Sequence, residues 1–239
     1  MVLRYGASDQ QTVEVMSPRV PREAKGMAVL VHGGYWRAKF DRTLMAGLAG
    51  DLVSRGWAVG NIEYRRSGNG GGWPETGDDV RAALRAVRGY AGEHHPQRPI
   101  VGVGHSVGGQ LALLGADLMD AVVALAPVSD VARADREGLG ENAALEFMGA
   151  ASSVAPAEYA QASPIRQLPL DRPMLLVHGD IDARVPVQHS RDFHAAALRH
   201  GDDVQLRIVP GLTHLDAIDP QAGHWQEVLQ WIEGVSPHE

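Results

Sequence analysis

Residues 100–110 read IVGVGHSVGGQ, an apolar run that leads into a serine flanked by glycines. Within it, Gly104-His105-Ser106-Val107-Gly108 fits the G-x-S-x-G pattern, in which a nucleophilic serine sits on a sharp turn between a strand and a helix. Glycines two positions from Ser106 let that strand and helix approach closely, and the positive end of the helix dipole lies under the serine. Because 28 of the 239 residues are glycine, a plain turn with a capping serine is the alternative.

Short apolar runs alternate with amphipathic helical patterns along the rest of the chain. This order predicts a mostly parallel sheet with helices on both faces. Val80, Ala83, Leu84 and Val87 mark one covering helix, with Thr76 as its expected N-cap. The first two of eight expected strands are too close for a helical crossover and should pair antiparallel. The expected strands are residues 3–5, 12–16, 27–32, 58–63, 100–104, 121–126, 174–178 and 205–209.

Residues 131–172 separate two expected strands by more than a usual connection length. They contain helical pieces and several prolines, so we expect a small lid over the sheet. No internal repeat or linker interrupts the pattern elsewhere. The sequence therefore predicts one domain over residues 1–239.

Composition narrows the function classes. The chain has no cysteine, which excludes disulfides, cysteine nucleophiles and thiolate metal sites. Its net charge is −7, and its 22 basic residues are scattered rather than clustered as in nucleic-acid binding proteins. No apolar run approaches the roughly 18 residues of a membrane span, and the first residues lack the apolar core of a signal peptide. We expect a cytoplasmic protein without nucleic-acid or membrane partners, and its oligomeric state stays open.

A second glycine-rich turn lies after an earlier expected strand. Residues 28–36 read AVLVHGGYW, so this strand opens into two glycines. Acyl transfer needs backbone N–H groups aimed at a developing oxyanion, and glycines let the main chain come close to it. We assign these donors to Val107 and Gly34, with Tyr35 as a third candidate, and expect His32 to brace the turn by hydrogen bonds.

The acid and the base should follow the last two strands, in the order serine, acid, histidine. Residues 174–186 read MLLVHGDIDARVP, which offers Asp180 and Asp182. We prefer Asp182 as the acid, because it lies further into the loop and can reach toward the histidine. Asp180 is the alternative acid, but we expect its side chain to bond turn amides instead. His214 follows the last strand within QLRIVPGLTHLDAIDP, residues 205–220, and is the histidine in the correct loop.

Aromatic residues follow two of the strand ends. Trp36 comes after the HGG turn, and Trp73 lies in a glycine-rich loop after the next strand. Loops at the carboxyl ends of parallel strands converge on the site of an open α/β sheet. We predict that at least one of the two walls a substrate pocket, with simple packing as the alternative, and that the bulk of Val107 favours short acyl chains.

These motifs resemble a known group of enzymes. HGGYW at 32–36, GHSVGG at 104–109 and HGDIDARVP at 178–186, together with His214 and the opening RYGASDQQTVEVMSP, are similar to acetyl-esterase-like α/β-hydrolases related to kynurenine formamidase (arylformamidase). The resemblance covers nearly the whole chain. It implies the α/β-hydrolase fold, a Ser106–Asp182–His214 triad and an HGGYW oxyanion hole. One departure is Val107, where the family often has alanine.

The prediction is a serine hydrolase that cleaves carboxylic esters or amides of small substrates, with aryl groups as candidates, through an acyl-enzyme and without metal or other cofactor. Kynurenine formamidase itself and a short-peptide hydrolase of the prolyl-oligopeptidase type are alternatives. A metal-dependent amidohydrolase is a further one, because Thr213-His214-Leu215-Asp216 echoes part of a metal motif, although Pro210 stands where its first histidine belongs. The last alternative is a non-catalytic binding protein on the same scaffold.

Overall fold

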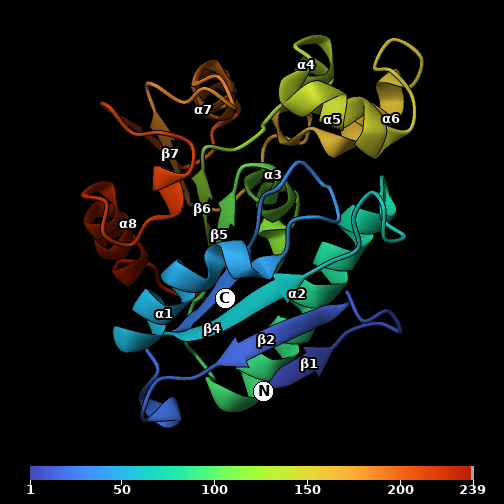
Figure 1. Cartoon of the computed structure of the whole chain (residues 1–239). Coiled ribbons are helices and arrows are strands. Elements are labelled where there is room, and N and C mark those ends of the chain that lie inside the picture. The colour runs from blue at the N-terminus through green and yellow to red at the C-terminus, as the bar shows by residue number, and fades with distance from the viewer. Residues whose placement is uncertain (238–239) are drawn as a thin grey trace.

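The computed structural model describes residues 1–237 and contains one eight-stranded sheet, in the order β1-β2-β4-β3-β5-β6-β7-β8 (Figure 1). All eight expected strands are confirmed, with each end within one residue of its expected position. The strands are β1 (Val2–Arg4), β2 (Thr12–Met16), β3 (Met27–Val31), β4 (Ala58–Glu63), β5 (Ile100–His105), β6 (Ala121–Leu125), β7 (Met174–Gly179) and β8 (Val204–Val209).

The pairing of the strands is mostly parallel. β1 pairs with β2 and β2 with β4 in antiparallel fashion, as expected for two strands joined by a short loop. Every other neighbouring pair, from β4–β3 to β7–β8, is parallel. The mostly parallel sheet predicted from the alternation of strands and helices is therefore confirmed.

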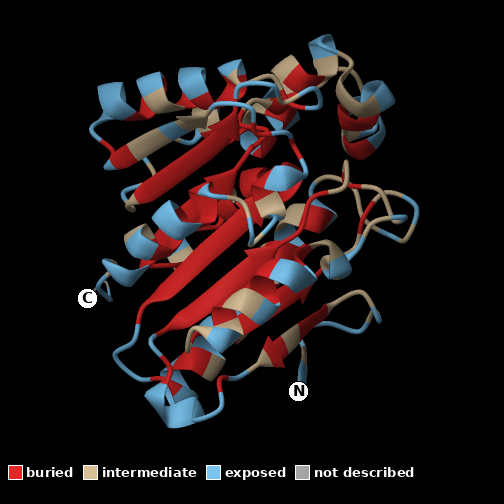
Figure 2. Cartoon of the chain, turned by 60° about the vertical axis from the view of Figure 1, so that its left-hand side comes forward, coloured by how far each residue is buried: buried red, intermediate tan, exposed pale blue. Residues whose placement is uncertain are grey.

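Helices cover both faces of this sheet, so its central strands are buried on both sides (Figure 2). Along β3, Ala28 and Leu30 belong to the core shared with α1 and α8, whereas Val29 and Val31 belong to the core shared with α2, α3 and α7. Within residues 1–237, no helix is both long and apolar enough to cross a membrane. The helices that share these two cores with β3 are α1 (Ala46–Ser54), α2 (Glu75–His94), α3 (Val107–Leu114), α7 (Gln188–His200) and α8 (His224–Glu233).

The residues expected to form a lid are mainly helical. α4 (Val131–Arg136), α5 (Leu139–Met148) and α6 (Pro156–Ala162) follow β6 and lie together at the upper right of Figure 1. Phe147 and Tyr159 from these helices are buried in the core that contains α2 and α3. We refer to residues 131–162 as the α4–α6 segment. The short 3-10 turns of the chain are η1 (Pro21–Glu23), η2 (Arg42–Met45), η3 (Ala116–Leu118), η4 (Pro164–Arg166) and η5 (Asp216–Ile218).

The expected N-cap of α2 is wrong. The helix begins at Glu75 and its N-cap is Pro74, so Thr76 lies inside the first turn. The Thr76 hydroxyl accepts the N–H of Gly72 at 3.2 Å and donates to the carbonyl of Arg65 at 2.7 Å. Thr76 therefore ties the glycine-rich loop before the helix to the end of β4, a tertiary role that a local capping pattern does not reveal.

Candidate active site

Ser106 lies in the turn between β5 and α3 with a backbone φ of 58° and ψ of −121°, and it is 4% exposed. The two positions that flank it in the motif, Gly104 and Gly108, leave no room for a side chain. A Cβ on Gly104 would lie 2.3 Å from the carbonyl oxygen of Gly108, and a Cβ on Gly108 would lie 2.1 Å from the carbonyl oxygen of Val31. Strand, helix and the neighbouring β3 thus meet at distances that no side chain permits, as the G-x-S-x-G pattern predicts.

The HGG turn lies directly against this serine. A Cβ on Gly33 would lie 2.9 Å from the carbonyl oxygen of His105 and 3.0 Å from the Cβ of Ser106. Gly34 has a φ of 114°, and a Cβ there would meet Phe40 at 2.3 Å. We refer to residues 33–37 as the glycine loop. Its two glycines allow β3 to deliver a backbone turn to the serine without intervening side chains.

The glycine loop leaves backbone donors free. Tyr35 and Trp36 have φ values of 59° and 54°, and the N–H of Arg37 closes the turn on the carbonyl of Gly34 at 3.0 Å. Within residues 1–237, the N–H groups of Gly34, Tyr35 and Val107 donate to no protein acceptor. Val107 opens α3, where the helix dipole favours negative charge. The three residues predicted as oxyanion donors therefore have N–H groups without a protein acceptor, one in the residue after Ser106 and two in the glycine loop.

Asp182, and not Asp180, contacts the histidine. The Nδ1 of His214 donates to Oδ2 of Asp182 at 2.7 Å. The other carboxylate oxygen of Asp182 accepts the N–H groups of Arg184 and Val185 at 2.8 and 2.9 Å. Asp180 instead accepts the N–H of Gly211 at 2.7 Å. The loop after β7 thus brings the preferred acid to His214 and uses the other aspartate to hold a turn.

Asp182 is kept ionised by its donors. Burial by itself would raise its pKa, but hydrogen bonds from His178 and His214 outweigh burial and hold the pKa of this carboxyl well below its usual range. A carboxylate at this position bonds the Nδ1–H of His214, which leaves Nε2 as the basic nitrogen.

The sequence pattern marks His178, at the end of β7, only as a strand residue. It is fully buried, and its Nε2 lies 2.9 Å from the carbonyl oxygen of Val185 and 3.3 Å from Oδ2 of Asp182. Both partners only accept, so Nε2 carries the proton. The Ser190 hydroxyl lies 2.7 Å from Nδ1 and donates to it. The sequence signal that could have revealed this role is a histidine at the end of an apolar strand, four residues before the candidate acid.

We refer to the G-x-S-x-G turn, residues 104–108, as the elbow, and its sequence pattern gives no sign that His105 has a role of its own. Its Nε2 donates to the carbonyl of His214 at 2.9 Å, and the two rings lie 4.6 Å apart. Burial, together with the neighbouring His214, lowers the pKa of His105 to about 3. A neutral imidazole therefore holds the backbone of the candidate base against the elbow.

His32 braces the start of the glycine loop, as the sequence analysis expected. Its Nδ1 donates to the carbonyl of Gly33 at 2.7 Å, and its ring stacks on Tyr64 at 4.3 Å. Nε2 faces the Glu63–Arg66 ion pair, which is buried. Burial raises the pKa of Glu63, but hydrogen bonds and neighbouring positive charge, His32 first, bring it below its ordinary value. Nothing local in residues 63–66 indicated this charged network.

The two predicted substrate-binding tryptophans are placed differently. Trp36 is 2% exposed, stacks on Phe147 at 4.5 Å and donates from Nε1 to Gln110 at 3.0 Å. It offers almost no surface to a ligand, so the packing alternative holds for Trp36, and the prediction that at least one of the two walls a pocket now depends on Trp73. Trp73 is half-buried, contacts the edge of Phe147, and lines a surface cavity of 290 Å³ with residues of α2, α3 and α6.

The expected role of the Val107 side chain is also corrected. Val107 is 1% exposed and belongs to the core beneath α3. A side chain buried in the core cannot narrow an acyl pocket. Only its backbone N–H remains a candidate for function.

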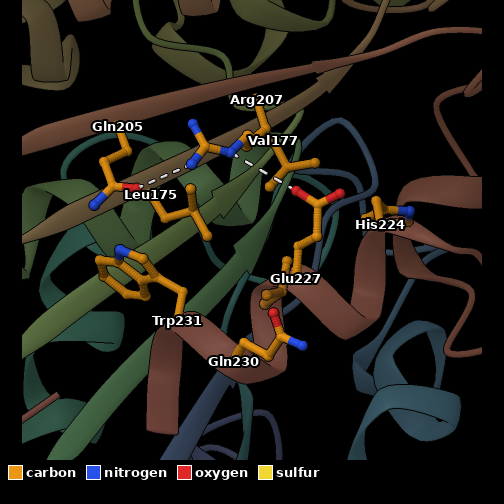
Figure 3. Close-up of a pocket in the computed structure, with 9 residues that line it drawn as sticks. Leu175, Val177, Gln205, Arg207, His224, Glu227, Gln230 and Trp231 are labelled. Atoms are coloured by element: carbon orange, nitrogen blue, oxygen red, sulfur yellow. Dashed lines mark hydrogen bonds and ion pairs between the residues drawn. The ribbon is translucent and has the colours of Figure 1, made fainter. Parts of the chain in front are cut away.

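A second cavity lies away from these residues. Figure 3 shows it between the β7–β8 edge of the sheet and α8. Its volume is 150 Å³. Arg207 spans it and contacts Glu227 at 3.7 Å and Gln205 at 3.4 Å. None of the predicted site residues lines this cavity, so it plays no part in the candidate site.

The metal alternative has no ligand cluster in the described part of the chain. Asp216 accepts the hydroxyl of Thr213 at 2.6 Å, and the Nδ1 of His214 faces Asp182. Within residues 1–237, no group of three or more histidine, aspartate or glutamate side chains is placed to hold a metal ion.

A family model and two curated proteins match the sequence. The family model is described as BD-FAE and matches residues 13–197, more than half of the chain. Two proteins of Escherichia coli, both called uncharacterized protein YfhR, are 27% identical over 192 residues and 29% identical over 194 residues. Each match covers 72% of this chain and 58% of the relative, so the chain spans little more than half the length of these relatives.

Solved structures share the fold. A truncated carbohydrate esterase from gut microbiota superposes with a TM-score of 0.83 at 21% identity, over 96% of this chain and 93% of its own. Esterase 2 of Thermogutta terrifontis superposes with TM-scores of 0.74 (butyrate bound, 23% identity) and 0.76 (phosphonylated by sarin, 22% identity), over 97% of this chain and 91% of its own in both structures. The fold is that of the α/β-hydrolase esterases. These matches do not support the narrower resemblance to kynurenine formamidase, which stays a prediction.

Proposed function

This chain belongs to the BD-FAE family, and we propose that it is a serine esterase with Ser106 as nucleophile, His214 as base and Asp182 as the acid that orients the base. One observation carries the proposal. The Asp182–His214 hydrogen bond of 2.7 Å lies in loops whose backbone is tied, through His105, to the turn that bears Ser106. A serine that only capped a helix would need neither an aspartate–histidine pair nor a histidine that ties this pair to its turn.

The mechanism follows from the direction of these hydrogen bonds. Since Nδ1–H of His214 is held by Asp182, Nε2 is free to take the hydroxyl proton of Ser106 as its Oγ attacks the ester carbonyl carbon. The N–H groups of Val107 and Gly34, with that of Tyr35, stabilise the resulting oxyanion. Protonated Nε2 then gives its proton to the leaving alkoxide, and the acyl group stays on Ser106. A water molecule, deprotonated by Nε2 of His214, then attacks the acyl-enzyme in the same way. This step releases the carboxylic acid product and returns the proton to Ser106.

For the substrate, we propose small-molecule esters with a short acyl group, formyl to butyryl. An esterase of the same fold is described with butyrate bound, which supports this range. Trp73, with part of its ring exposed, favours an aromatic leaving group. The reaction as proposed uses no metal or other cofactor.

Active-site labelling tests the proposal. Wild-type protein should react with a fluorophosphonate probe, and peptide mapping should find the adduct on Ser106. The Ser106→Ala variant should not react. Labelling at another residue, or equal labelling of both proteins, would refute the assignment of the nucleophile.

A substrate panel then separates ester hydrolysis from the alternatives. Para-nitrophenyl esters of rising acyl length should be cleaved, fastest at short length. Faster turnover of N-formylkynurenine than of any ester would make the enzyme a kynurenine formamidase. Preference for aminoacyl-arylamides would make it a short-peptide hydrolase of the prolyl-oligopeptidase type.

A further inference from the structure

Two left-handed backbone segments face each other beside the candidate site. In the glycine loop, Gly34, Tyr35 and Trp36 all have positive φ. At the start of α5, residues 140–142 have φ values of 60°, 58° and 62°, a short left-handed turn that includes Glu141 and Asn142. This conformation is unfavourable for residues with a Cβ and persists only where surrounding contacts impose it. Contacts with the rest of the protein must therefore hold these two turns in place.

The ring of Tyr35 lies against the backbone of Gly140. A Cβ at Gly140 would fall 2.1 Å from Cδ1 and 2.3 Å from Cε1 of the Tyr35 ring. Only glycine leaves room for the ring there. The next residue of the loop, Trp36, stacks on Phe147 at the other end of α5, with an angle of 5° between the rings.

Arg37 joins the two turns by hydrogen bonds. Its Nε donates to Oε2 of Glu146 at 2.7 Å, and one terminal nitrogen donates to the carbonyl of Glu141 at 3.2 Å. Its own N–H closes the glycine loop on Gly34. One residue thus binds both the left-handed turn of α5 and the turn that carries the free N–H groups. The opposite side of the loop is held by backbone bonds to Ser67.

We propose that Arg37 is a positioning residue that clamps the glycine loop to α5, so that the N–H groups of Gly34 and Tyr35 stay aimed at the oxyanion. This role rests on the proposed esterase function. Oxyanion donors act only when they are fixed before the reaction, and a turn with consecutive positive φ values would otherwise relax. The α4–α6 segment then serves as a brace for the oxyanion hole.

The test compares two arginines that anchor the same segment. Arg37→Met keeps the side-chain stem and removes the guanidinium. Arg133→Met is the matched control, because Arg133 in α4 bonds Glu137 at 2.5 Å and Asp192 of α7 at 2.9 Å, away from the glycine loop. The two side chains are similarly exposed, at 21% and 24%. Circular dichroism and melting temperature should show that both variants fold.

For Arg37→Met, kcat with para-nitrophenyl acetate should fall about tenfold or more, with KM within about twofold, because the oxyanion forms only after the substrate is bound, in the tetrahedral intermediate and the transition states on either side of it. Inhibition by a trifluoromethyl ketone, which forms an oxyanion adduct, should weaken by a similar factor. Arg37→Lys should recover part of the loss through a bond to Glu146. Arg133→Met should match wild type in all three measurements.

Several results would overturn the proposal. Equal losses in both variants would place the effect in the α4–α6 segment as a whole, and a change in KM alone would make Arg37 a substrate-binding residue. Wild-type kcat in Arg37→Met would show that the clamp is unnecessary. A wild-type protein that ignores the fluorophosphonate probe would refute the esterase function and this inference with it. A labelled wild type with an unaffected Arg37→Met would refute only the inference.

Discussion

The two halves of the candidate site are held by different parts of the molecule. Asp182 and His214 lie in loops that follow β7 and β8, and their supports, His178 and His105, are buried at the ends of β7 and β5. The glycine loop follows β3, but three of its residues contact α5, which lies outside the sheet (Figure 1). The acid–base half is thus built on the sheet, and the oxyanion half depends on an added helical segment.

This difference has a consequence for how the site tolerates change. Buried hydrogen bonds to an ionised carboxylate hold the acid–base half, so loss of one donor leaves the others in place. The glycine loop combines backbone of positive φ with contacts to α5, which lies outside the sheet. Changes in the α4–α6 segment should therefore affect oxyanion stabilisation before they affect the acid and the base.

Ser106 stands where the halves meet, so its loss should have the largest effect. Ser106→Ala should lower kcat for para-nitrophenyl acetate by roughly 10⁴-fold or more, because neither half can act without the nucleophile. The melting temperature should stay near that of wild type. A purified variant that keeps a tenth of the wild-type kcat would show that the halves do not converge on this residue.

Within the acid–base half, Asp182→Asn should lower kcat by about 10³- to 10⁴-fold, because asparagine removes the charge and permits the wrong tautomer of His214. Asp180→Asn is the matched control and should stay within about threefold of wild type, since the carboxylate of Asp180 accepts the N–H of Gly211 and, within residues 1–237, does not bond His214. Reversed effects in the steady-state kinetics would move the role of the acid to Asp180.

His178→Leu tests how Asp182 is supported, because it removes one side-chain donor to this carboxylate and leaves the backbone donors. We expect kcat to fall about tenfold and the free energy of unfolding to fall by about 1–3 kcal/mol, the range for an unsatisfied buried group. His178→Gln can still donate and should recover part of both. If Leu and Gln variants share one kcat, His178 is only a packing residue.

The depressed pKa of Asp182 predicts how this half responds to acid. The unfolded carboxyl has its usual pKa of 3.8 and the folded one lies well below it, so ionised Asp182 stabilises the fold above about pH 4. That contribution is lost as the pH falls toward the folded pKa. In urea unfolding, the stability difference between wild type and Asp182→Asn should shrink from pH 6 to pH 3. A constant difference would mean that the donors do not favour the charged form.

Trp73 should give the smallest effect, because it lines a cavity beside the α4–α6 segment and contacts no residue of the acid–base half. Trp73→Ala should raise KM for phenyl esters about fivefold more than for ethyl esters with the same acyl group. Equal changes in both series would leave Trp73 as a packing residue.

The strands and the elbow could be predicted because their signals are local. Short runs of mainly apolar residues mark β3, β5, β6 and β7, and the clash that a Cβ would meet at Gly104 or Gly108 explains why the elbow carries a recognisable motif. Thr76 shows the limit of such signals. Its residue type and position are typical of an N-cap, yet its hydroxyl bonds the N–H of Gly72 and the carbonyl of Arg65.

The order of strands and helices, the elbow at Ser106 and the loops expected to supply acid and base can be read from the amino-acid sequence alone, since each depends on residues close together in the chain. The packing of the folded chain brings Asp182 rather than Asp180 to His214, buries Trp36 and places Arg37 against α5. Arg37 and Glu146 are 109 residues apart. Periodicity and spacing describe neighbours along the chain, whereas such contacts depend on how distant segments pack in space.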